Sequence, residues 1–429
     1  MGVLCEVPLM IPHLPEGWSI TILISTAVQV PFIASIIILV IYSLCPSYMK
    51  ENLAIYSILG LGVISMLLLS AFWKSSVIIY GKSHSVALLI LITILGIVDN
   101  SSSVIFFPYV KKFPLVYLRA LFVGEGLTGM IPAILKIIQG GAIPYCRNVS
   151  TVRGIDNTTI WTLNEEYTNP HFSVSTYFIV LAIILLTSFV SFILIENCPA
   201  FTQIAKMHTR NRVSVDQTFD VIDGQLFLLK DEMKKYTETG LDNKQLSKCE
   251  YWYLQGQTCF SSFLLWGVVY SLYTYSLLPY GFKITNIALI LMNILRIGAY
   301  ALASLIPLRT ISKINIINLF FVIPSLYLIF CAAMSPCPPF VDTKYGGLIV
   351  IVCFILCDFI MTWIRTCVGD LMMVNGGNSL MVFGMLTNVG ISVGAISCVI
   401  IDLKYHLLQS RNICKSLSSQ CTGYRSRFL

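Results

Sequence analysis

Apolar residues run in long stretches along this chain and seldom alternate with polar ones. Runs of about 20 apolar residues match the thickness of a lipid bilayer, and windows of this length predict ten membrane-spanning helices. They are expected at Ile20–Leu44, Leu53–Phe72, Ser85–Phe107, Tyr117–Ile138, Ser173–Ile195, Phe260–Leu278, Thr285–Leu305, Ile314–Met334, Gly346–Ile364 and Ser379–Leu403. The pattern predicts an all-α, polytopic transmembrane bundle.

One long polar segment divides the apolar runs into two sets of five. Residues 196–255 carry both charge signs and lack long apolar windows, as expected of a linker between two bundles. We therefore predict an N-terminal bundle at 1–195, a cytoplasmic linker at 196–255, a C-terminal bundle at 256–403 and an extracellular tail at 404–429.

Composition supports the membrane assignment and excludes several functions. The 429 residues are 56% hydrophobic and 11% charged, whereas soluble domains are about a quarter charged. The net charge of +7 is spread over the loops, which disfavours a nucleic-acid partner. The cysteines form no C-x-x-C pair and the histidines lie far apart, so no metal site or cofactor is expected. The chain also lacks a phosphate-binding G-x-x-x-x-G-K-[ST] loop and a G-x-S-x-G elbow, so neither an ATPase nor another enzyme is expected.

Basic residues set the orientation of the spans. One side of the predicted membrane carries fifteen Lys and Arg residues, Arg119 and Arg365 among them, and the other side, before the tail, carries six, so the first side should be cytoplasmic. The loop 141–172 lies on the opposite side and contains two glycosylation sequons, at Asn148 and Asn157. Both signals place this loop and both ends of the chain outside.

Five charged residues fall inside predicted spans, where each costs about 2.5–3.5 kcal/mol to insert. They are Asp99, Glu125, Lys136, Arg296 and Asp358. Two explanations are open at this stage. The charges can pair across helices and hold the bundle together, or they can line a water-filled path and contact a solute.

Two stretches favour contact with a solute. Asp99–Ser103 brings polar groups within about two helical turns of aromatic residues, and Gly124–Gly129 places Glu125 among three glycines and a threonine. Helix packing explains glycines but not a carboxylate between them. The candidate solute-binding residues are Asp99, Asn100, Ser103, Phe106, Glu125, Thr128, Tyr273 and Asn293.

Four runs together resemble the animal riboflavin transporter family: Leu14–Trp18, Asp99–Pro108, Phe122–Gly129 and Met334–Pro338. The resemblance implies a facilitative carrier that takes riboflavin into the cell across the plasma membrane without ATP hydrolysis. Members of the family have eleven spans. The resemblance thus places Gly2–Leu9 at the end of the first span, as a remnant of that helix.

The residues alone leave two alternatives open. The chain can be a carrier of another polar aromatic solute, such as a nucleoside, or a membrane receptor or scaffold that transports nothing. A disulfide is also expected among the cysteines predicted to be outside. The preferred pair is Cys337 with Cys414, and Cys421 and Cys146 are the alternatives.

Overall fold

The computed structural model describes residues 2–44, 51–140, 144–153, 158–204, 207, 246–341, 343–375, 379–405, 408–409 and 414. Its helices are α1 Gly2–Met10, α2 Ile20–Gln29, α3 Phe32–Leu44, α4 Glu51–Phe72, α5 Val86–Val110, α6 Leu115–Gln139, α7 Val174–Asn197, α10 Lys248–Ser262, α11 Tyr270–Leu277, α12 Phe282–Leu305, α13 Ile311–Ala333, α14 Lys344–Asn375 and α15 Ser379–Tyr405. Asn157, most of the predicted linker and most of the tail lie outside the described residues, as does the side chain of Ser103.

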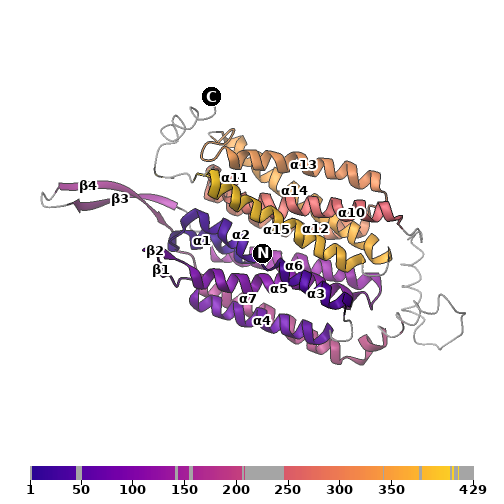
Figure 1. Ribbon diagram of the computed structural model, residues 1–429. Helices are drawn as coiled ribbons and strands as arrows, with labels where there is room; N and C mark the ends of the chain where they lie inside the picture. The colour runs from indigo at the N-terminus through magenta and orange to yellow at the C-terminus, as the bar shows by residue number, and fades with distance from the viewer. Residues whose placement is uncertain are drawn as a thin grey trace, which may run out of the picture.

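The helices pack side by side in one elongated bundle with two distinct ends (Figure 1). Two antiparallel hairpins lie at the end that we call the hairpin end: β1 Val77–Ile79 with β2 Lys82–His84, and β3 Pro144–Arg153 with β4 Thr158–Tyr167. At the opposite end, which we call the loop end, α7 finishes and α10 begins.

Nine helices in the described part of the chain are long and apolar enough to cross a membrane. They correspond to nine of the ten predicted spans. The remaining segment, expected at Phe260–Leu278, is helical throughout but is divided into α10, a π-helical stretch at Phe263–Val269 and α11. Glycines explain this geometry, because a side chain on Gly267 would come within 2.8 Å of the backbone of Gly394 in α15. The π-helical segment and α15 thus pack backbone against backbone.

The first predicted span is also interrupted, between α2 and α3 at Pro31. Proline has no N–H, so it leaves helical carbonyl groups without their usual donors. Side chains from two other helices supply donors in the membrane interior. Asn100 of α5 donates to the carbonyl oxygen of Val28 at 2.8 Å, and Ser392 of α15 donates to that of Gln29 at 3.2 Å.

Helices α1–α7, here called the first half, lie together, and helices α10–α15, the second half, lie beside them (Figure 1). The halves meet where α6 packs on α12 and where α15 packs on α2, α3 and α5. The division of the chain into two independent bundles and a linker stays a prediction.

One disulfide joins Cys146 to Cys414, with their Cα atoms 5.7 Å apart. The preferred pairing of Cys414 with Cys337 is therefore wrong, and one of the two alternatives is correct. Strand β3 places Cys146 next to the residues that follow α15, a proximity that a count of loops could not reveal. Cys337 is itself disulfide-bonded.

Candidate functional site

Glu125 projects from the middle of α6 toward the inside of the bundle. The apolar residues of α6 that are exposed on its opposite side are Val123, Leu127, Ile134 and Ile138. At about 100° per residue, Glu125 points about 180° away from this lipid-facing side. Its side chain is nevertheless 42% exposed, so it borders accessible space between helices.

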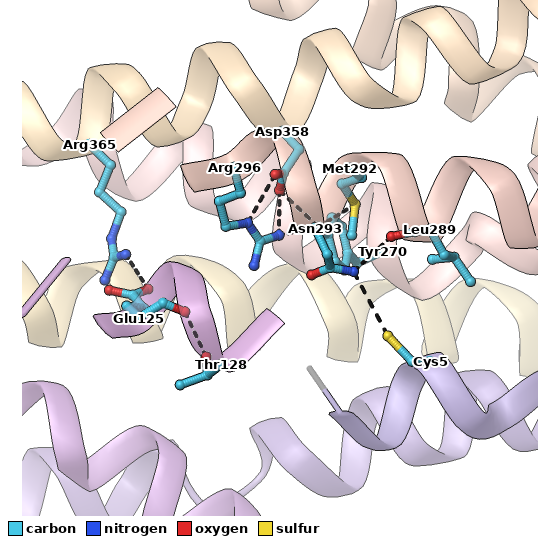
Figure 2. Close-up of polar contacts among 10 residues, drawn as sticks. All are labelled: Cys5, Glu125, Thr128, Tyr270, Leu289, Met292, Asn293, Arg296, Asp358 and Arg365. Carbon is cyan, nitrogen blue, oxygen red and sulfur yellow. Dashed lines mark hydrogen bonds and ion pairs between the residues drawn. The ribbon is translucent and has the colours of Figure 1, made fainter. Parts of the chain in front are cut away.

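Arg365 of α14 is the ion-pair partner of Glu125 (Figure 2). The Arg365 Nη1 atom lies 2.5 Å from Glu125 Oε1, and the arginine side chain is only 8% exposed. Its guanidinium also lies 5.2 Å from the ring centre of Trp266 and 5.7 Å from that of Phe122, within the range of cation–π attraction. Its Nε is buried and has no hydrogen-bond partner among the described residues.

The prediction that Arg365 lies on the cytoplasmic side of the ninth span is wrong. That span was expected to finish at Ile364, whereas α14 continues to Asn375 and buries the arginine. A span predicted from hydropathy ends at a charged residue because the hydropathy scale counts every charged side chain as exposed to water. Here Glu125 supplies the compensation, as expected for a basic side chain inside a membrane protein.

Asp99 of α5 adds a second carboxylate to this region. Its side chain is exposed and makes no hydrogen bond or ion pair with the described residues, but it interacts electrostatically with both Glu125 and Arg365. We call Asp99, Glu125 and Arg365 the central cluster. It contains two carboxylates and one guanidinium. The sequence predicts that the two carboxylates, Asp99 and Glu125, contact a solute.

A second network is fully buried in the second half. Arg296 of α12 donates to both carboxylate oxygens of Asp358, from Nε at 3.0 Å and from Nη2 at 2.6 Å. Tyr270 donates its hydroxyl to the same carboxylate at 2.8 Å (Figure 2). Asp358, Thr362 and Arg365 follow one another at i, i+4 and i+7 along one face of α14. This face therefore carries the second network and one member of the central cluster.

The remaining intramembrane charge, Lys136, pairs with a residue that the sequence analysis missed. Its Nζ lies 3.1 Å from Glu6 Oε2 in α1, and Gln139 donates to the other oxygen of Glu6 at 2.7 Å. Glu6 and Lys136 are both buried. Because α1 has only nine residues, no hydropathy window pointed to a charge within it.

The other predicted residues occupy different surroundings. Asn100 donates a hydrogen bond at the break between α2 and α3, and Phe106 packs beside Ile55 and Phe192 of α4 and α7. Thr128 donates to the backbone of Glu125 at 2.7 Å, while Tyr273 is buried and donates to the carbonyl oxygen of Leu4 at 3.4 Å. These contacts hold helices in place.

Asn293 of α12 is the remaining candidate, and it lies at the interface between the halves. Its amide nitrogen donates to the carbonyl oxygen of Leu289 at 2.8 Å, whereas its Oδ1 is buried and accepts no hydrogen bond from the part of the chain that the structure describes. That oxygen faces Gly129 of α6, where a side chain would collide with it. The glycine thus permits the close approach of α6 and α12.

Comparison with known proteins identifies similar sequences along nearly the whole chain. The family model described as solute carrier family 52, riboflavin transporter, matches residues 1–410. The chain is 27% identical to solute carrier family 52, riboflavin transporter, member 3-A of Danio rerio, covering 97% of this chain and 94% of that protein. It is 27% identical to member 1 of Homo sapiens, covering 96% and 92%, and 24% identical to member 3 of Homo sapiens, covering 96% and 94%.

Proposed function

Since the chain belongs to the riboflavin transporter family, solute carrier family 52, we propose that it is a facilitative carrier that imports riboflavin across the plasma membrane. Transport would need no ATP hydrolysis and would follow the riboflavin gradient. The names of relatives that align over nearly the full chain support riboflavin as the solute.

The observation that best supports a carrier is the central cluster. Glu125 faces the interior of the bundle and is partly exposed, and the Asp99 side chain makes no hydrogen bond or ion pair with the described residues. Ionised carboxylates accept hydrogen bonds from hydroxyl groups, and the ribityl chain of riboflavin offers several. The flat isoalloxazine ring can stack on Trp266 or Phe122, and the Arg365 guanidinium can donate to the carbonyl oxygens of the ring. The proposed site thus offers partners for both the ribityl chain and the isoalloxazine ring of riboflavin.

Uptake of labelled riboflavin tests this proposal. Cells that express the chain should accumulate more label than matched cells without it, and excess unlabelled riboflavin should suppress the difference. Purified protein in liposomes without ATP should exchange internal for external riboflavin. No uptake by protein shown to be at the cell surface would contradict the proposal. Suppression by a nucleoside but not by riboflavin would support the alternative of a nucleoside carrier.

We further propose that the hairpin end is extracellular. Arg119 and Arg365 lie within helices, but the excess of basic residues on the predicted cytoplasmic side persists without them. Asn148 is exposed on β3, as an acceptor of a glycan must be.

The Asn148→Gln variant is accordingly expected to lose one glycan when it is made in glycosylating cells. Its apparent mass on a gel should fall, and glycosidase treatment should remove the remaining difference from wild type. Protease added to intact cells should leave the linker at 196–255 uncut. Cleavage there from outside would reverse the orientation.

A further inference from the structure

An ion pair connects the two halves near the loop end. Arg119 lies in the first two turns of α6, and Asp370 lies near the end of α14. Two guanidinium nitrogens of Arg119 donate to Asp370 Oδ2, at 3.2 and 3.3 Å. The side chains are 21% and 10% exposed. This pair is separate from the central cluster, although it joins α6 to α14 as the Glu125–Arg365 ion pair does.

Next to this ion pair, four aromatic rings close the space between the halves. Phe107 and Phe122 come from α5 and α6, and Tyr300 and Phe383 come from α12 and α15. Ring centres are 6.2 Å apart for Phe107 and Phe122, 6.1 Å for Phe122 and Tyr300, and 6.3 Å for Phe107 and Phe383. None of the four is more than 3% exposed. We call them the ring layer.

The hairpin end is packed differently. There the buried residues of the two large apolar clusters come from one half each, and the partly buried Leu4 of α1 packs against both clusters. A small cluster of Ile22, Tyr275 and Ala332 connects the halves at this end. The largest cluster that contains both halves includes the ring layer and lies at the loop end. The halves are therefore joined by more buried apolar residues on the loop-end side of the central cluster than on its hairpin-end side.

We propose that the Arg119–Asp370 ion pair and the ring layer form a closed gate at the loop end, which must open for a solute to leave the central cluster in that direction. The proposal rests on the carrier function proposed above. Separating the halves here breaks one partly exposed ion pair and exposes four rings to water. Packed apolar interfaces of this kind switch between two discrete arrangements and do not deform continuously.

Cys367 is a native reporter for the state of this gate. It lies in the apolar cluster that includes the ring layer, is 2% exposed and has a free thiol. Cys249, near the start of α10 at the loop end, is exposed and also free. A membrane-impermeant maleimide should therefore react fast with Cys249 and slowly with Cys367. Mass spectrometry of digested protein can measure both rates in one sample.

Removing the ion pair should open the gate more often. In the full-length protein in membrane vesicles, Asp370→Asn is expected to raise the labelling rate of Cys367 by about tenfold, which corresponds to a shift of about 1.4 kcal/mol toward the open state. The rate at Cys249 should not change. The charge-swapped variant Arg119→Asp/Asp370→Arg should return the Cys367 rate toward wild type. Asp402→Asn, which removes a carboxylate near the hairpin end, serves as the matched control and should leave both rates unchanged.

Two results would overturn the gate. One is an unchanged Cys367 rate in Asp370→Asn, and the other is an equal rise in the charge-swapped variant. If Asp370→Asn does not fold, Arg119→Lys replaces it, because lysine keeps the charge but loses the paired donors; it should raise the rate by a smaller factor. Labelling needs no solute, so a failed uptake experiment would contradict the carrier function without altering this measurement.

Discussion

Replacing Glu125 by glutamine is expected to remove most riboflavin uptake while the protein still reaches the cell surface. Glutamine keeps the size of the side chain and one acceptor oxygen but loses the charge. Hydrogen bonds to charged groups contribute about 1.5–3 kcal/mol, so uptake at low riboflavin concentration should fall roughly ten- to a hundredfold. Uptake and surface biotinylation, measured on the same cells, check this result.

A structural role for Glu125 predicts a different pattern. The variant also leaves Arg365 without its partner, and that alone could disturb the protein. The double variant Glu125→Gln/Arg365→Gln removes both charges and separates the two roles. Restored uptake in the double variant would show that Glu125 only neutralises Arg365. Equal uptake by Glu125→Gln and wild type at equal surface levels would exclude the carboxylate from the binding site.

The second large effect is expected at the buried network of Arg296. In Asp358→Leu the arginine, which is 4% exposed, loses the carboxylate that accepts two of its hydrogen bonds. Breaking a buried pair in this way is destabilising by about 3–5 kcal/mol, a large share of the 5–15 kcal/mol by which folded domains are typically stable. The variant should show a lower Tm in detergent and little protein at the cell surface.

The double variant Arg296→Met/Asp358→Leu should recover much of this stability, because it removes both buried charges and keeps similar volume. Tyr270 would lose both charged partners, but its hydroxyl keeps a contact with the Met292 sulfur at 2.9 Å. Fluorescence-detected size-exclusion chromatography and thermal unfolding measure the recovery. A single variant as stable as wild type would show that Arg296 is hydrated, in conflict with the buried ion pair.

The sequence by itself determined the class of fold and most of the spans. Whether a run of residues can cross a bilayer depends on its own length and polarity, so nine predicted spans correspond to helical segments that are apolar enough to cross a membrane, eight of them continuous. The same local reasoning singled out Asp99, Glu125 and Asp358, because the cost of placing a charge in lipid belongs to each residue separately.

Only the tertiary structure decided which residues meet. Arg365 was assigned to the cytoplasm because its partner Glu125 is 240 positions away, and Cys414 was paired wrongly because Cys146 is 268 positions away. The π-helical stretch in the sixth predicted span packs closely against glycines of α15. Phe106 contacts α4 and α7 because of the way these helices pack on α5. Each of these features is set by contacts between helices. Hydropathy measures the exchange of a segment between water and lipid, and it contains no information about the neighbour that a side chain finds inside the bundle.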